Sequence, residues 1–193
     1  MIYVEKSMKI FNRAIKILLV TNALILVAAA MLGPIYALFV EEIGGDLLDA
    51  GFTFGTFAVV AGITSLITGK YADKVKDNEL IVALGYGITG IGFFGYTLVN
   101  SMETLLVAQV IIGLGGAIAS PAFDSVYSKH IDGHTSGSAW GAWEAINYFT
   151  LALGAVSGGF LATLFGFGAL FVVMGLLCFA SAIYIVRLPR NVL

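Results

Sequence analysis

Hydrophobic residues are grouped into six long stretches of this chain, separated by four short polar segments and, at residues 165–168, by an uncharged Phe-Gly-Phe-Gly segment. They cover approximately residues 15–40, 50–68, 80–99, 104–127, 137–164 and 169–186. A helix needs about 20 apolar residues to cross the hydrocarbon core of a bilayer, and each stretch is close to or above that length. The pattern predicts an all-α integral membrane protein, with residues 1–193 forming one domain of six transmembrane helices. Pro34 is expected to kink the first helix.

The composition supports a membrane location. Charged residues make up 11% of the chain and hydrophobic residues 59%, whereas typical soluble domains carry about 25% charged residues. A soluble fold of this length could not bury so much apolar surface, so the lipid bilayer is an expected partner. No nucleic-acid partner is expected.

The positive charges are distributed unevenly among the polar segments. All ten Lys and Arg residues lie at the N-terminal end of the chain up to Lys16, in the segments 69–78 and 128–136, or in the C-terminal tail. Positively charged loops remain on the cytoplasmic side of a membrane. Both termini and the segment 69–78 are therefore predicted to be cytoplasmic, and the expected location is the plasma membrane.

Small residues form stripes along two predicted helices, because steps of three or four place them on one face. The stripe of the second helix comprises Gly51, Gly55, Ala58, Gly62, Ser65 and Gly69, and that of the fifth comprises Gly141, Gly154, Gly158 and Gly159. Such stripes let membrane helices approach closely, so both are expected to be packing surfaces.

Polar residues share one face of the fourth and fifth predicted helices. These faces carry Gln109, Gly113, Gly116, Ser120 and Asp124 in the fourth helix, and Glu144, Asn147 and Leu151 in the fifth. Polar residues within a span face a wet cavity or the bundle interior. Hydrogen bonding between helices is an equal alternative for Gln109 and Asn147. We expect Asp124 to pair with loop lysines, and Glu144 is the candidate for a titrating or solute-facing group.

The sequence contains no motif for catalysis or cofactor binding. It lacks a phosphate-binding glycine loop, HExxH and GxSxG, and both histidines, His130 and His134, occupy a polar loop. The only cysteine, Cys178, lies in an apolar stretch and is expected to have a packing role. The predicted protein is not an enzyme and has no catalytic residue, cofactor or metal.

Segment 69–78 resembles the signature G-x-x-x-D-R/K-x-G-R-R/K, which joins helices two and three in the major facilitator superfamily. Gly69, Asp73 and Lys74 match this signature. The fifth helix is similar to the superfamily's antiporter signature G-x8-G-x3-G-P-x2-G-G, where the matching residues are Gly141, Gly154, Gly158 and Gly159. In the fourth helix, Gln109 and Gly113 occupy the positions of the superfamily's R-x-x-x-G.

The resemblance implies a six-helix half of a fold that normally holds twelve helices in two similar halves. The half resembles the N-terminal half of drug/proton-antiporter-type transporters. The implied function is secondary transport of a small solute by alternating access, performed by a parallel homodimer and directed to proton-coupled efflux. A non-transporting membrane scaffold, or a half that pairs with a different six-helix subunit, is the alternative.

The resemblance also suggests roles for individual residues. Gly69, Asp73, Lys74 and Asp124 would form a conformational latch, with Asp73 near the start of helix five in the second copy. The stripe of helix two would meet the glycines of helix five in that copy. The cavity candidates are Asn22, Tyr36, Gln109, Ser120, Glu144 and Asn147, and Glu144 is the candidate for proton coupling.

Overall fold

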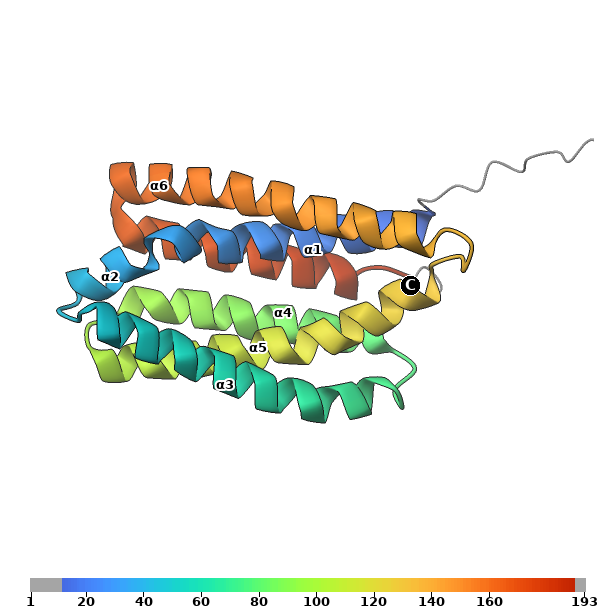
Figure 1. Cartoon of the computed structure of the whole chain (residues 1–193), viewed down its shortest axis with the longest axis horizontal. Helices are drawn as coiled ribbons and strands as arrows, with labels where there is room; N and C mark the ends of the chain where they lie inside the picture. Colours follow the sequence, from blue (N-terminus) through green and yellow to red (C-terminus); the bar gives the residue numbers. More distant parts are fainter. Residues whose placement is uncertain (1–11, 190–193) are drawn as a thin grey trace, which may run out of the picture.

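The computed structural model describes residues 12–189, so Lys6, Lys9 and Arg190 lie outside the described residues. The described chain is helical and contains no strand. Its helices are α1 (Arg13–Leu32), η1 (Gly33–Ile35), α2 (Tyr36–Glu42), α3 (Leu47–Ala72), α4 (Asn78–Gly95), η2 (Tyr96–Leu98), α5 (Met102–Lys129) and α6 (Ser136–Val186). Figure 1 shows the longer helices running side by side along one axis.

Five helical segments of the described chain are long and apolar enough to cross a membrane. They are Arg13–Glu42, Leu47–Ala72, Asn78–Leu98, Met102–Lys129 and Ser136–Val186. The first is interrupted by the 3₁₀ turn that contains Pro34, as its ring geometry leads us to expect.

The last segment, α6, reverses its direction at Gly166, whose φ of 76° and ψ of 171° are not helical. Its first limb (136–165) and second limb (167–186) both lie along α1 (Figure 1). Gly158 contacts the backbone of Met31, and the Ser181 hydroxyl donates to the carbonyl oxygen of Thr21 at 2.8 Å. The loop predicted at 165–168 is thus a break at one glycine, which is flexible enough for a positive φ.

Polar residues between the helices act as helix caps. The Asp46 carboxylate accepts hydrogen bonds from the backbone N–H groups of Leu48 and Asp49, and the Asp49 carboxylate accepts from the N–H of Asp46. Ser101 and Thr104 form the same reciprocal arrangement at the start of α5. These capping boxes supply donors and acceptors at helix ends, so α3 and α5 begin earlier than the apolar stretches alone predict.

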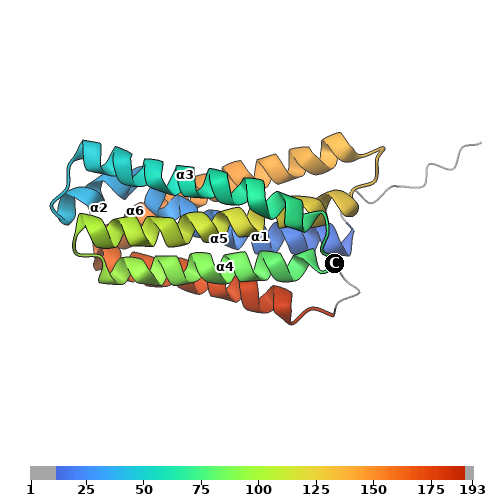
Figure 2. The same cartoon turned by 90° about the horizontal axis from the view of Figure 1, so that it is seen from below.

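The helices pack in two connected groups. In one group α1 lies against both limbs of α6, and in the other α5 lies between α3 and α4, as Figure 2 shows. The second limb of α6 also contacts α4 and joins the groups. Consequently α3 and the first limb of α6 occupy opposite edges of the molecule (Figure 1).

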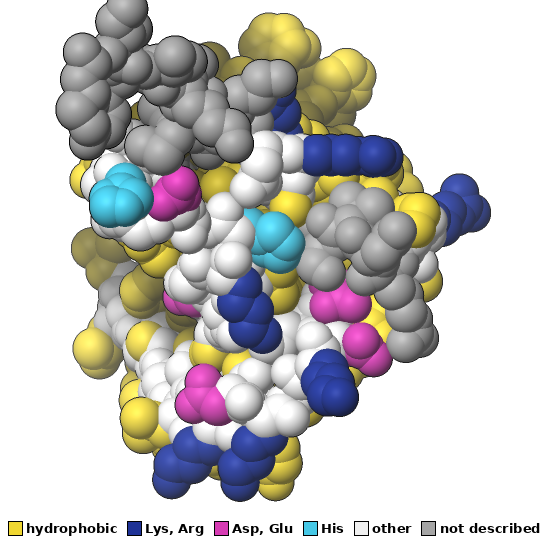
Figure 3. All heavy atoms as spheres, turned by 90° about the vertical axis from the view of Figure 1, so that its right-hand side faces the viewer, with side chains coloured by type: hydrophobic (Ala, Val, Ile, Leu, Met, Phe, Trp, Pro, Cys, Tyr) yellow, Lys and Arg dark blue, Asp and Glu magenta, His cyan; other side chains and the backbone are white. Residues whose placement is uncertain are grey.

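The two ends of the bundle differ in charge. All Lys and Arg side chains among residues 12–189 belong to one end, which we call the basic end: Arg13, Lys16, Lys70, Lys74, Lys76, Lys129 and Arg187. Figure 3 looks onto this end and shows the cationic and histidine side chains gathered there. Glu41, Glu42, Asp46 and Glu103 lie at the opposite, acidic end.

Candidate functional site

A pocket of about 570 Å³ opens at the basic end, between the last turn of α3 and the last turns of α5. Its lining includes Gly69, Asp73 and Asp124, so the structure brings together three of the four residues expected to form a latch. Lys74, the fourth, does not line this basic-end pocket. The buried amide of Asn78 holds the pocket wall together, because its Nδ2 donates to the Ala72 carbonyl at 2.9 Å and to Ser125 Oγ at 3.1 Å.

The surroundings of Asp124 differ from those expected. Its side chain is half-buried, and among residues 12–189 it forms no ion pair, although the lysines at positions 70, 74, 76 and 129 are all described. The expected pairing of Asp124 with a loop lysine is therefore wrong for this structure. Asp124 instead lines two neighbouring pockets, the basic-end pocket and a smaller one deeper in the bundle.

The smaller pocket, which we call the inner pocket, has a volume of about 160 Å³. Asn22 and Ser120, both predicted to line a cavity, reach it from α1 and α5. Tyr86 of α4 and Trp143 of α6 also line it, and sequence reasoning missed both, because aromatic residues in apolar stretches are usually packing residues. The Tyr86 hydroxyl donates to Asn22 Oδ1 at 3.1 Å.

A third pocket of about 450 Å³ lies toward the acidic end and has mainly aromatic and aliphatic walls. Two predicted cavity residues meet there, since Gln109 Nε2 donates to the Tyr36 hydroxyl at 2.7 Å. That hydroxyl also forms a 2.6 Å hydrogen bond with Thr53 Oγ1, a partner that the sequence did not indicate. No Asp, Glu, Lys or Arg side chain lines this aromatic pocket. It offers an apolar ligand a few neutral hydrogen-bonding groups.

The two polar residues predicted in the fifth helix lie apart from these pockets. Glu144 is exposed on the first limb of α6, and Asn147 is partly exposed. Neither lines the basic-end, inner or aromatic pocket. Their roles in a cavity stay predictions. Any cavity that contains them would have to form on a surface of the first α6 limb that the single protomer leaves uncovered.

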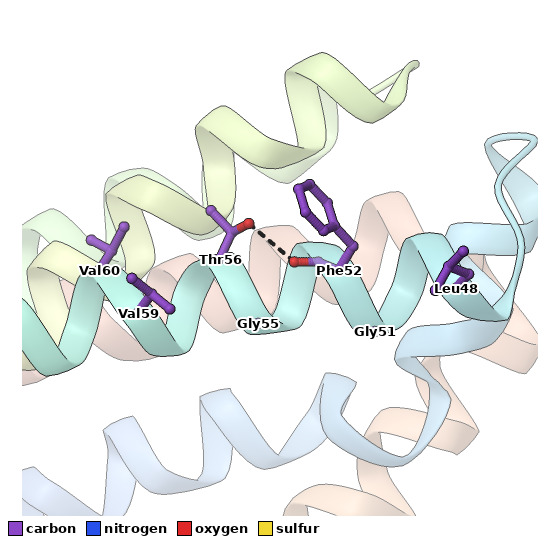
Figure 4. A pocket seen from close by; sticks show the side chains of 7 residues that line it. All are labelled: Leu48, Gly51, Phe52, Gly55, Thr56, Val59 and Val60. Carbon is purple, nitrogen blue, oxygen red and sulfur yellow. Dashed lines mark hydrogen bonds between the residues drawn. The ribbon is translucent and has the colours of Figure 1, made fainter.

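The stripe of small residues on α3 is almost uncovered within the protomer. Cβ atoms added at Gly51, Gly55 and Gly62 would meet nothing within 4 Å. In the most apolar 18-residue stretch of α3, only 11% is buried, whereas at least 39% is buried in the corresponding stretches of the other four segments. Figure 4 shows Gly51 and Gly55 in one shallow pocket along α3, where Thr56 donates only to Phe52 of its own helix. We call this surface the α3 groove.

The glycines of the first α6 limb are divided between two faces. Added Cβ atoms at Gly154 would lie 2.6 Å from Ala30 Cβ and 2.7 Å from the Val27 carbonyl oxygen, and Gly158 is as tightly packed on Met31. Added Cβ atoms at Gly141 and Gly159 would meet nothing within 4 Å. The expectation that Gly154 and Gly158 contact a second copy is wrong, because α1 of the same protomer already occupies that face.

Comparison with known proteins identifies the family. The sequence matches the Major Facilitator Superfamily over residues 18–192. The chain therefore belongs to the Major Facilitator Superfamily, as its motifs predicted, and its homologues are membrane transporters and not enzymes.

Several curated relatives are much longer than this chain. The multidrug resistance protein MdtG of Erwinia billingiae is 24% identical over 176 residues, which are 89% of this chain and 43% of MdtG. The quinolone resistance protein NorA of Staphylococcus aureus is 23% identical over 185 residues, which are 93% of this chain and 47% of NorA. The chain thus spans about half the length of these relatives. The MFS-type transporter YitZ of Bacillus subtilis is 22% identical over 160 residues, which are 83% of this chain and 97% of YitZ.

Proposed function

We propose that this chain is one half of a secondary transporter, and that two copies form a parallel homodimer that moves a small solute by alternating access. The observation that carries the proposal is the uncovered α3 groove at one edge of the protomer, opposite the first limb of α6. A two-fold axis along the membrane normal would place each α3 against the α6 limb of the other copy. The same contact would then form twice and enclose a central cavity.

Close helix approach, and not hydrophobicity, is the basis of this interface. Lipid covers an apolar helix as well as protein does, so association in a bilayer depends on packing between small residues. Gly51, Gly55 and Gly62 provide such a surface on α3. On α6 the corresponding surface would be the open face that contains Gly141 and Gly159.

The orientation and the number of crossings are also part of the proposal. Each protomer would cross the plasma membrane six times, with the two limbs of α6 as separate crossings. The basic end would face the cytoplasm, because positively charged loops are retained there. This places the basic-end pocket at the cytoplasmic surface and the aromatic pocket in the outer half of the membrane.

Asp73 would close the cytoplasmic side of the dimer. It is exposed at the basic end. Helix α6 begins at the same end, at Ser136, and Thr135 provides no side-chain cap there. The first N–H groups of a helix are unsatisfied and carry partial positive charge. An aspartate from one copy facing these groups in the other would stabilise the outward-open state and separate when the cytoplasmic side opens.

The solute would be small and amphipathic, since the aromatic pocket is uncharged and has few polar groups. Relatives named for multidrug and quinolone resistance favour efflux as the direction. Exchange for protons through Glu144 completes the proposal. Glu144 is exposed and has no ion-pair partner within residues 12–189.

Cross-linking in the membrane tests the assembly. We would place cysteines at Gly55 and Gly159 in a Cys178→Ala background. At 1.5 Å per residue, Gly55 lies about 12 Å and Gly159 about 10 Å from the acidic end of its helix, so the two cysteines would have a similar depth in the membrane. They occupy opposite edges of one protomer, so a cross-link between them must join two copies. A matched pair at Gly55 and Gly87, whose α4 position is also open, should not react. Solute flux in liposomes should then depend on the dimer.

The outcomes separate the alternatives. A dimer joined from α3 to α6 with solute flux supports the transporter. A monomer, or a cross-link that forms only with another polypeptide, contradicts the homodimer and favours the scaffold or the mixed pair. Flux that persists unchanged in Glu144→Gln would contradict proton coupling through that residue.

A further inference from the structure

The inner pocket combines one carboxylate with aromatic rings inside the bundle. Residues of α1, α4, α5 and the first limb of α6 line it, and its volume is about 160 Å³. Its polar and aromatic lining residues are Asn22, Tyr86, Ser120, Phe123, Asp124 and Trp143. Asp124 is the only Asp or Glu among the residues that line it, and no Lys, Arg or His does.

Two polar groups of this pocket have no partner among the described residues. The indole Nε1 of Trp143 is buried and makes no hydrogen bond, and the Asp124 carboxylate makes no ion pair. A buried donor without an acceptor is rare and costly, and a carboxylate within a membrane span is costly unless it is compensated. Tyr86 does not compensate the Asp124 carboxylate, because its hydroxyl proton is donated to Asn22 Oδ1.

We propose that the inner pocket binds a small ammonium head group that carries an oxygen atom, such as an amino alcohol. The positive charge would lie between the Asp124 carboxylate and the faces of Tyr86 and Phe123. Aromatic rings attract such cations through their quadrupoles, and more strongly where water is excluded. The oxygen would accept the hydrogen bond that the Trp143 N–H offers.

The site differs in chemistry from the other pockets. The aromatic pocket has no charged lining residue, and the basic-end pocket contains a cation, Lys129, beside Asp73 and Asp124 and has no aromatic lining residue. Asp124 lines both the basic-end and the inner pocket. Asp73 also lines the basic-end pocket, so a cation held at Asp124 would lie beside the same pocket as the proposed Asp73 closure, which links occupancy of the site to opening of that end. Only this last link depends on the proposed transport function.

Choline and its neutral isostere 3,3-dimethylbutan-1-ol test the site, since they share a shape and differ in charge. In Trp140→Phe protein in nanodiscs, Trp143 is the only tryptophan, because the chain contains two. We expect choline to change its fluorescence saturably and the neutral alcohol to bind at least tenfold more weakly. An equal response to both compounds, or none, overturns the proposal without any variant of Asp124.

Two variants assign the contacts by calorimetry. Asp124→Asn should abolish the preference for choline, whereas Glu103→Gln, which neutralises an exposed carboxylate at the other end of α5, should keep it. Trp143→Phe should weaken choline at least threefold but leave tetramethylammonium, which has no oxygen, unchanged. Retention of the preference in a folded Asp124→Asn protein overturns the site. Binding needs neither flux nor a dimer, so a failed cross-link with intact choline binding contradicts only the proposed function.

Discussion

The hydroxyl of Thr68 in α3 donates a hydrogen bond to the backbone carbonyl oxygen of Ala117 in α5, at a distance of 2.7 Å. Pro121 is four residues beyond Ala117 and has no N–H, so this carbonyl has no donor within its own helix. α5 nevertheless continues to Lys129. A side chain of α3 thus replaces the missing bond and attaches α3 to α5 beside the basic-end pocket, whose lining includes Pro121.

Replacing Thr68 with Val should destabilise the protein by about 1–2 kcal/mol, because the Ala117 carbonyl would be left unsatisfied where water is scarce. In a Pro121→Ala background, residue 121 regains its N–H and can supply that bond. The Thr68→Val substitution should then cost much less. Chemical unfolding of all four proteins in detergent gives this double-mutant cycle. Equal costs in both backgrounds would show that the bond to Ala117 contributes nothing.

Replacing Gly158 with Ala should destabilise the protein by about 1–3 kcal/mol, because the new methyl group would overlap the backbone of Met31. Gly87→Ala on α4 is the matched control, since its methyl group would meet nothing within 4 Å. Alanine is also the better helix former, so the control should be neutral or slightly stabilising. The midpoints of thermal unfolding compare the two variants, and equal midpoints would contradict the α1–α6 contact.

The sequence indicated an all-helical chain with long apolar helices, because apolar stretches and their polar boundaries are local properties. It placed a four-residue loop at 165–168 where the structure has a break at Gly166 alone, since a turn made of Phe and Gly has the same hydropathy as the helices beside it. It also placed the start of α3 too late, because Asp46 and Asp49 were assigned to a loop, whereas they cap the helix.

The candidate site could be predicted only in part. Motif resemblance brought Gly69, Asp73 and Asp124 together, and the structure places all three in one pocket. Spacing predicted a packing face that contains Gly154 and Gly158 but could not predict which helix lies against it, and in the structure that helix is α1. The contact between Thr68 and Ala117 joins residues far apart in sequence, and no local pattern reports such a contact.

Replacing Gly62 with Leu should prevent dimerisation without destabilising the protomer. A Cβ at this position meets nothing within 4 Å, but a bulky side chain would keep a second helix from the α3 groove. Mass measurement in nanodiscs should show monomers, and the unfolding midpoint extrapolated to low protein concentration should equal that of the unmodified protein. Gly87→Leu on α4, also open in the protomer, is the control and should remain dimeric. Dimers of Gly62→Leu would exclude the α3 groove as the interface.

Replacing Asp73 with Asn should shift the dimer toward the state that is open at the basic end. The substitution removes the negative charge that we place opposite the N-terminus of α6 in the second copy, and it keeps the side-chain shape. A carboxylate at a helix N-terminus contributes roughly 0.3–1 kcal/mol, which corresponds to a change of about two- to fivefold in the ratio of the two states.

Cysteine labelling measures this shift. In a Cys178→Ala background, a cysteine at Ser120 in the inner pocket should react about two- to fivefold faster with a maleimide added at the basic end in the Asp73→Asn protein. A cysteine at Gly33 in the aromatic pocket should react more slowly from the acidic end. Asp132→Asn makes the same charge change in the exposed loop before α6 and should leave both rates unchanged. Asp73 and Asp132 are both exposed, so salt screens both charges. Equal changes of the labelling rates in the two variants would mean that net charge, and not the position of Asp73, sets the ratio of the two conformational states.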